Sequence, residues 1–403
     1  GMLILAGNNT FTGGGNATAG TGGVALTNGT LVINSFAGNG PLGALNGAGD
    51  VVNRFIHGSG GNNTALTYMG AGETVARIVE FAGSGGTASI EANGYGALVF
   101  AAGSMTFTNT GTKTINLRGV SMEPNEIAAV IANNGANTIA LTKNDFGTWY
   151  LSGNNSYSGG TTINGGVLAI GHNSALGSGT VTFASNNGAL QAVGGARSIS
   201  NTISLSNGQG VVSGANSLTI SGNVQATGGT GYLVNFLPVG SAGANYTGGV
   251  DAGQDAAYLA SGGKLLTLSG LIRTGDTATA RTVSIRGTGV TLITGQVVNN
   301  TAVTTLRAEA YTVPSMNQSA GLVILAGTVA NTHTGGVDVT GGVLQNNMAA
   351  SLTPLGTSAG NLQFNGNGFF QSSVNLSGLN KLSNSVGFGN GTSATVGTFQ
   401  GSQ

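Results

Sequence analysis

Short runs in which apolar and polar residues alternate recur along the whole chain, and Gly, Asn or Ser bounds most of them. Such alternation predicts strands with one buried face, whereas helical periodicity is hard to find. The clearest runs are Thr87–Glu91, Gly96–Phe100, Met105–Phe107, Thr114–Leu117, Thr138–Leu141, Thr180–Phe183, Thr202–Leu205, Ser217–Ile220, Lys264–Leu268, Thr282–Ile285 and Val290–Ile293. The chain is therefore expected to be all-β.

One segment, Ser121–Ala136, fits two kinds of secondary structure. Pro124 stands between Glu123 and Glu126, as at the start of a capped short helix. Against that, Ile127–Ile131 leads into the next alternating run in the way that strands do elsewhere in the chain. The surrounding repeat favours the strand.

Three segments share one design: Gly1–Gly14, Gly147–Gly179 and Gly321–Leu344. Each has a short apolar strand, a Gly, an Asn-rich turn, an aromatic residue or His, and a Gly-Gly pair; the two longer copies continue into a second strand. A unit this short cannot bury its apolar face alone and must stack on its neighbours. The pattern predicts a single elongated β-solenoid over residues 1–403. Because the chain begins within a repeat, we expect an open first coil, and the chain is expected to be either a mature product or an excerpt of a longer protein.

The turn positions of these copies are expected to be structural. Asn tolerates the left-handed backbone of turns, and stacked Asn side chains can form amide ladders. The residue two positions after the last turn Asn is expected to pack at the edge of the core. The residues concerned are Asn8, Asn9, Asn154, Asn155 and Asn331 at the turns, and Phe11, Tyr157 and His333 after them.

Two regions, residues 41–80 and 225–263, lose the repeat and hold many of the chain's charged and aromatic residues. Insertions in solenoids form lateral loops that often carry binding, so these regions are predicted to bind a surface glycan or a protein. The alternative is that both only cover the flank of the rod. The candidate partner-binding residues are Arg54, His57, Tyr68, Tyr232, Phe236, Tyr246 and Tyr258.

Composition supports a folded array and excludes one class of partner. Glycine accounts for 75 residues, proline for 5, and apolar residues for 40%, which is too apolar for disorder. Only 6% of residues are charged, and the net charge is zero. Without a basic face, the chain is not expected to bind nucleic acid. A surface wetted by Asn, Thr, Ser and Gln is typical of secreted and cell-surface fibres.

Several kinds of segment are missing from the sequence. There is no cysteine, so neither disulfides nor thiolate metal sites are expected. No apolar run reaches about 18 residues, so no transmembrane helix is expected. The first residues lack a basic region followed by an apolar stretch, so no signal peptide is expected in them. No cofactor is predicted.

Residues Asn137–Phe183 carry a more specific pattern. Its features are Leu141-Thr142-Lys143, Gly147-Thr148-Trp149, Leu151–Asn155, Tyr157–Thr162 and Ala175–Gly177. The segment resembles the autotransporter-associated β-strand repeat of bacterial passenger domains, and weaker copies lie at Gly1–Ile33 and Gly321–Leu355. The resemblance implies a right-handed parallel β-helix exported to the outer surface of a bacterium, and it implies no shared active site.

Other motifs are weak. Gly356–Gly360 matches the G-x-S-x-G nucleophile motif, but no His or acidic residue follows Ser358. The three histidines, His57, His172 and His333, lie far apart and have no cysteine to join them, so no metal site is predicted.

Enzymatic cleavage of polysaccharides needs paired carboxylates on one exposed face. The nearest pairs are Glu123 with Glu126 and Asp251 with Asp255, and neither has the spacing of one coil. The sequence therefore favours a non-enzymatic extracellular surface protein, either a stalk or adhesin or a subunit that assembles end to end into filaments. A carbohydrate-active β-helix remains the alternative.

Overall fold

A computed structural model describes most of the chain, in two compact units. Unit 1 comprises Gly1–Thr182 with Asn187–Leu190, and unit 2 comprises Phe183–Asn186 with Gln191–Gln403. The residues that the structure describes are 1–7, 24–37, 41–42, 55–58, 62–75, 77–206, 210–228, 232–236, 244–246, 250–252, 256–260, 265–274, 279–287, 289–299, 302–309, 321–348, 352–357, 360–365, 368–373 and 386–388.

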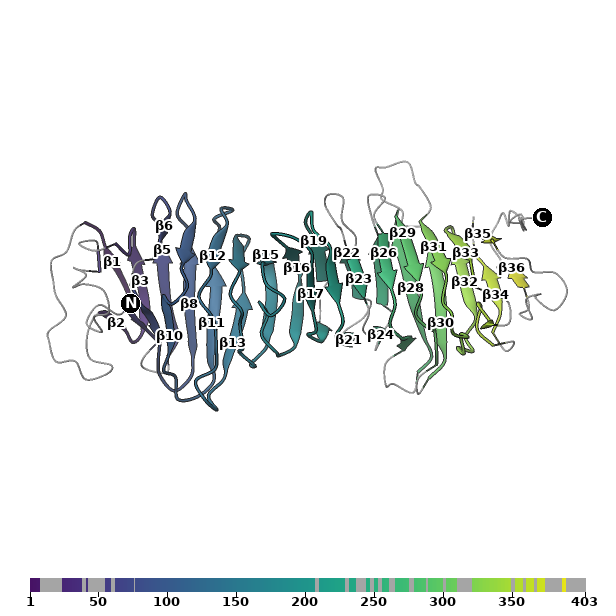
Figure 1. The fold of residues 1–403 in the computed structure, drawn as a ribbon, viewed down its shortest axis with the longest axis horizontal. Helices are drawn as coiled ribbons and strands as arrows, with labels where there is room; N and C mark the ends of the chain where they lie inside the picture. Colours follow the sequence, from purple (N-terminus) through teal and green to yellow (C-terminus); the bar gives the residue numbers. More distant parts are fainter. Residues whose placement is uncertain are drawn as a thin grey trace. The chain divides into compact units, whose positions relative to one another are not determined.

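Unit 1 is built from three ladders of parallel strands, drawn in purple to teal in Figure 1. The first ladder contains β1 (Met2–Leu5), β3 (Gly29–Ile33), β5 (Thr64–Tyr68), β8 (Thr87–Ala92), β11 (Lys113–Arg118), β13 (Ile139–Lys143) and the start of β15 (Thr161–Ile170). The second contains β6 (Glu73–Thr74), β9 (Leu98–Phe100), β12 (Asn125–Ile127), β14 (Thr148–Leu151) and the end of β15. The third contains β2 (Val24–Leu26), β4 (Phe55–His57), β7 (Val79–Phe81) and β10 (Met105–Phe107).

Unit 2 repeats this plan. Its first ladder contains β18 (Ile203–Ser206), β21 (Val224–Gly228), β24 (Val250–Ala252) and β27 (Ile272–Thr274). The second contains β19 (Gly210–Ser213), β22 (Tyr232–Phe236), β25 (Ala256–Ala260), β28 (Arg281–Gly287), β30 (Thr304–Glu309), β32 (Val337–Thr340), β34 (Leu362–Phe364) and β36 (Val386–Phe388). The third contains β17 (Arg197–Ile199), β20 (Leu218–Ile220), β23 (Ala244–Tyr246), β26 (Leu265–Leu268), β29 (Val290–Ile293), β31 (Leu322–Leu325), β33 (Val343–Asn346) and β35 (Phe369–Ser372). Strand β16 (Val181–Ala192) contributes residues to both units.

The core of each unit consists of columns of inward side chains from successive coils. In the first ladder of unit 1, Leu31 pairs with Leu66, Leu66 with Ile90 and Ile90 with Leu117. These four side chains are buried, and full burial of one such side chain stabilises the fold by about 1.5–3 kcal/mol. Alternation within a strand sends the intervening residues outward, because successive side chains point to opposite faces. The next member of the column is Lys143, which is also buried.

Buried Asn side chains join consecutive coils through the backbone. Asn155 Oδ1 accepts a hydrogen bond from Ile131 N at 2.8 Å, and its Nδ2 donates to Ala175 O at 2.7 Å. In unit 2, Asn331 forms the same bridge between Val297 N and Pro354 O. Each of these amides therefore satisfies a backbone group on the coil before it and another on the coil after it.

The amide ladder predicted for these turns lies elsewhere. Asn144 Nδ2 donates to Asn116 Oδ1 at 2.6 Å, and Asn164 Nδ2 donates to Asn144 Oδ1 at 2.8 Å. Asn155 and Asn331 bond to backbone groups instead, because buried backbone groups beside a turn need partners. Asn154, next to Asn155, is exposed.

The secondary structure agrees with the sequence pattern. The alternating runs are strands, and the described residues contain no α-helix. Residues 125–127 form β12, so the helical interpretation of Ser121–Ala136 is wrong. Within the described part of the chain, no helix has the length and apolarity needed to span a membrane. The continuity of a single rod over residues 1–403 and the right-handed coil stay predictions.

The two regions predicted to be insertions belong to the coils wherever they are described. Strands β4, β5 and β6 occupy the first region, and β22 to β25 occupy the second. Strands β4, β5 and β22 to β25 pair with a coil before and a coil after, and β6 pairs with β9 on the coil after it. The described parts of both regions thus form coils, because a coil requires only alternation and backbone pairing. The rest of both regions lies outside the described residues, and lateral insertions there stay a prediction.

The Asn155 bridge predicts a large difference between two neighbouring substitutions. Asn155→Ala leaves a buried N–H and a buried C=O without partners, so it should lower the free energy of unfolding by about 2–4 kcal/mol. Asn154→Ala, at the adjacent exposed position, should change it by less than about 0.5 kcal/mol. Urea denaturation followed by the fluorescence of Trp149 measures both, and equal effects would contradict the assigned bridge.

Candidate binding surface

One corner of unit 1 carries exposed apolar side chains on four successive coils. This corner joins the first ladder to the second and comprises residues 69–72, 93–97, 119–124 and 144–147. The exposed fractions are 48% for Met69, 79% for Tyr95, 61% for Val120, 69% for Met122 and 70% for Phe146. We call these five side chains the apolar ridge.

Backbone hydrogen bonds hold the four segments of the corner in register. Tyr95 N donates to Gly70 O at 3.0 Å, and Gly147 N donates to Gly119 O at 2.9 Å. Val120 N donates to the side-chain oxygen of Asn93 at 3.1 Å. The four coils that carry the ridge are therefore stacked about 4.8 Å apart.

Glycine makes this close stacking of corners possible. A Cβ atom at Gly94 would overlap Gly70 O, and one at Gly96 would overlap Ala71 O. Tyr95 lies between these two glycines, so its neighbours pack against the coil before while its own ring projects into solvent. The glycines that allow the backbones of neighbouring coils to approach closely therefore also leave the Tyr95 side chain exposed.

Phe146 lies in a turn that follows Asp145 and is held by hydrogen bonds from the buried side chain of Lys143. Asp145 has a left-handed backbone, with φ of 58°. Below it, the buried Lys143 Nζ donates to the carbonyl oxygens of Asn144 at 2.6 Å, Asp145 at 3.0 Å and Gly165 at 3.0 Å. Burial lowers the pKa of Lys143 to about 8, and the three carbonyls keep its ammonium solvated within the protein.

The ridge ends at the following coil. Strand β15 crosses the corner at Asn164, Gly165 and Gly166, and Gly166 has a positive φ of 63°. A Cβ atom at Gly166 would lie 2.5 Å from both Asp145 O and Gly147 O. No large side chain can therefore continue the ridge on this coil.

Charged side chains flank the ridge on its outer surface. Arg118 bridges two coils, because its Nη1 lies 2.7 Å from Glu91 and its Nε lies 3.2 Å from Asp145. Glu123 is exposed, and Glu126 accepts a hydrogen bond from Ser152 Oγ. We call Glu91, Glu123, Glu126 and Asp145 the acidic rim.

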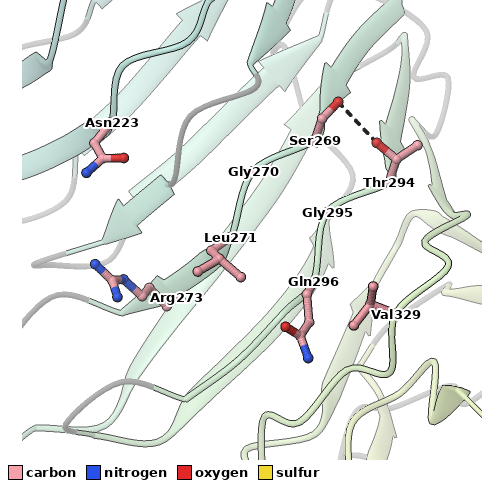
Figure 2. A pocket seen from close by; sticks show the side chains of 9 residues that line it. All are labelled: Asn223, Ser269, Gly270, Leu271, Arg273, Thr294, Gly295, Gln296 and Val329. Carbon is pink, nitrogen blue, oxygen red and sulfur yellow. Dashed lines mark hydrogen bonds between the residues drawn. The ribbon is translucent and has the colours of Figure 1, made fainter.

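A second candidate is a groove of about 620 Å³ in unit 2, shown in Figure 2. Ser269 and Thr294 share a hydrogen bond of 3.1 Å along one side, and Leu271 and Val329 expose apolar surface. The lining residues are Asn223, Ser269, Gly270, Leu271, Arg273, Thr294, Gly295, Gln296 and Val329. Hydroxyl and amide groups dominate its polar lining, and none of the predicted site residues lies in it.

Two of the predicted partner-binding residues are buried, so that prediction is wrong for them. His57 is 0% exposed and Tyr68 is 1% exposed. His57 Nε2 lies 2.8 Å from Ser89 O, and its Nδ1 lies 3.1 Å from Thr64 Oγ1. A neutral imidazole that donates from Nε2 and accepts at Nδ1 satisfies both contacts, and burial lowers the pKa of His57 to about 4.

The remaining predicted residues fall into three groups. Tyr232, Phe236, Tyr246 and Tyr258 lie on strands for which the structure describes the backbone alone, and Arg54, Asn8, Asn9 and Phe11 lie outside the described residues. Tyr157 and His333 are both 0% exposed and follow Asn155 and Asn331 at the same distance. Among described residues, no three His, Asp or Glu side chains gather as metal ligands would.

Sequence reasoning missed the ridge entirely. Members on adjacent coils are 24 to 27 positions apart in the sequence and form no conspicuous motif; of the five, Tyr95 alone lies between two glycines. The available signal was the G-x-G segment at residues 94–96, in which a tyrosine replaces a turn residue. Coil register was needed to align it with Phe146.

The fold defines the chain as a parallel β-solenoid, and comparisons with known proteins refine that class. A family model named passenger-associated-transport-repeat matches residues 141–170 and 318–345. The chain is also 39% identical over 107 residues to the Adhesin BmaC autotransporter of Brucella suis biovar 1 (strain 1330). This match covers 26% of the chain and 3% of that adhesin. No solved structure matches the chain.

The resemblance inferred from Asn137–Phe183 is confirmed by these matches. Residues 141–170 span β13, β14 and most of β15, and residues 318–345 include β31 and β32. The chain is a β-solenoid in which residues 141–170 and 318–345 match the passenger-associated-transport-repeat. It is similar, over 107 residues, to an adhesin autotransporter.

The buried imidazole of His333 predicts an acid-sensitive fold in unit 2. Burial lowers its pKa from 6.5 to about 4, so the unfolded chain takes up the proton first and stability falls as the pH drops from 6.5 towards 4. His333→Phe, which restores an aromatic ring as at Tyr157, should remove about 2–3 kcal/mol of this loss at about pH 4.5. Urea denaturation followed by circular dichroism at several pH values tests this, and an unchanged pH dependence would contradict it.

Proposed function

We propose that the chain is a non-enzymatic, adhesin-like passenger segment displayed on the outer surface of a bacterium. Passenger repeats in both units and the 39% identity to an adhesin over 107 residues support this assignment. The stacked coils serve as a scaffold, and the surface they display makes the contact.

The observation that carries the proposal is the apolar ridge. Soluble proteins rarely expose a contiguous row of large apolar side chains unless it binds something. Tyr and Met are also enriched in the centres of protein interfaces. Tyr95 and Phe146, the two most exposed members, are therefore the proposed principal contacts.

A polysaccharide-cleaving enzyme is less well supported. Among the described carboxylates, Glu91 and Asp145 both contact Arg118, which ties them into a structural ion-pair network between coils. Glu126 is hydrogen-bonded to Ser152 on the next coil. These contacts favour a structural role over the paired acid and base of a glycosidase. Asp255 lies outside the described residues, and the side chain of Asp251 is not described.

End-to-end self-association stays a prediction. Strand β1 exposes Met2, Leu3 and Ile4, and a pocket of about 360 Å³ lies beside it. A preceding coil of the same protein would pair with β1 in the same way as a second copy. The exposed edge therefore does not by itself favour a filament over a longer solenoid.

The adhesive role predicts that two ridge substitutions abolish attachment. Beads coated with the purified chain should attach to cultured epithelial cells, and Tyr95→Ser with Phe146→Ser should reduce the attached number by about tenfold or more. Both side chains are largely exposed, so the variant should keep the melting temperature of the parent. Flow-chamber counting of attached beads measures the effect.

The matched control removes exposed apolar groups from the groove of unit 2. Leu271→Ser with Val329→Ser should leave attachment unchanged. Loss of attachment in this variant alone would assign the adhesive surface to the groove. Parent beads that attach no better than albumin-coated beads would contradict the adhesin proposal itself.

A further inference from the structure

The surface around the apolar ridge is acidic although the chain as a whole is neutral. Four carboxylates, Glu91, Glu123, Glu126 and Asp145, lie on or beside the corner. Arg118 is the cation among them, and it already contacts two of the four. The acidic rim therefore keeps a net negative charge next to exposed aromatic and thioether groups.

The missing positive charges are inside the protein. Among the described residues of unit 1, Arg77 is 3% exposed, and Lys113 and Lys143 are both 0% exposed. Arg77 donates to the carbonyl oxygens of Phe36 and Leu42, and Lys113 donates to Gly58 O at 2.9 Å. These cations stabilise the backbone of the coils. Lys143 also interacts electrostatically with Asp145 and offsets part of the charge of the acidic rim, while Glu91, Glu123 and Glu126 still outnumber Arg118.

The negative charge of the acidic rim favours some classes of binding partner over others. A second copy docked ridge to ridge would bring two acidic rims together, because a two-fold interface uses the same patch on both partners. Anionic lipids and acidic polysaccharides would meet the same repulsion. A partner that combines an apolar stripe with flanking Lys or Arg residues would gain from both features of the surface.

The spacing of the ridge indicates the form of that partner. Its four coils are separated by about 4.8 Å each, so the ridge extends over about 14 Å. The turns of an α-helix are separated by about 5.4 Å, which is closer to the coil spacing than the repeat of about 6.7 Å between same-face residues of a strand. Apolar side chains at i, i+3, i+4 and i+7 of a helix would thus lie along three to four members of the ridge.

We propose that the apolar ridge and acidic rim form a docking site for a basic amphipathic helix of another protein. The proposal rests on the proposed function, in that it names the chemistry of the partner which the adhesive surface contacts. Tyr95, Met122 and Phe146 contact the apolar stripe of the helix. The acidic rim, with Glu123 as its most exposed member, contacts the flanking basic residues.

A model helix tests the chemistry directly. A fluorescein-labelled peptide of about 18 residues, with Leu on one helical face and Lys on the other, is titrated with the full chain in a fluorescence anisotropy assay. Binding is expected, and it should weaken as the salt concentration rises from about 0.05 M to about 0.5 M. The same peptide with Glu in place of Lys should not bind.

Three variants locate the site on the chain. Tyr95→Ser with Phe146→Ser should weaken binding of the Leu/Lys peptide by about tenfold or more. Glu123→Lys should weaken it by about threefold to tenfold and flatten its salt dependence. Leu271→Ser with Val329→Ser, in unit 2, should bind as the parent does, and circular dichroism checks that each variant is folded.

The possible results separate this inference from the proposed function. Equal binding of the Leu/Glu peptide, binding to anionic phosphatidylglycerol vesicles instead, or unchanged binding by the folded ridge variant would overturn the inference. If beads attach to cells through the ridge while the Leu/Lys peptide does not bind, the adhesive role stands and the partner chemistry is wrong. If the peptide binds through the ridge while beads do not attach, the adhesive role fails and the docking site stands.

Discussion

The parallel hydrogen-bonded register between successive coils is the constraint from which the other features follow. It places Leu66, Ile90 and Leu117 in one column, so each coil has to present a side chain that fits above its predecessor. It brings the amides of Asn155 and Asn331 within reach of backbone groups on two neighbouring coils. It also forces glycine into the corners, where the backbones approach too closely for a Cβ atom. The exposed ridge is the outward side of this packing.

Cations buried in unit 1 show how a neutral chain acquires an acidic surface. Lys143 and Lys113 occupy inward positions on strands whose other inward residues are mostly apolar. A buried ammonium is tolerated only when hydrogen bonds replace its water, and carbonyl oxygens at the corners supply them. The outer face then keeps the carboxylates with little compensation. Net charge computed from composition hides this separation, because it does not distinguish the two sides of a strand.

The sequence predicted the fold better than the binding surface. The reason is that strands are encoded by neighbouring residues, whereas the binding surface depends on residues that are far apart in the sequence. Alternation is local, so β8, β10, β11 and β29 were found within two residues of their bounds. The repeat around Tyr157 and His333 also identified an equivalent buried position. The ridge depends on the register of residues on different coils, which single-sequence patterns do not encode. His57 and Tyr68 were misplaced because charge and aromatic content suggested a loop, whereas alternation in β4 and β5 turns both side chains inward.

Strand β15 crosses the corner at Gly165 and Gly166, which have no side chains, so this coil adds nothing to the apolar ridge. The length of the ridge is thus set by the number of coils that carry an exposed apolar residue. Each coil contributes about one exposed apolar position to the corner, and the coil without a side chain stops the row. The length of the apolar ridge therefore changes by one coil at a time, and duplication or deletion of a coil would lengthen or shorten it by that step. Because the inward columns and the outward corner residues are separate positions, such a surface can change its contacts over evolution without repacking the interior. The corner residue of each coil can therefore be substituted independently of the others.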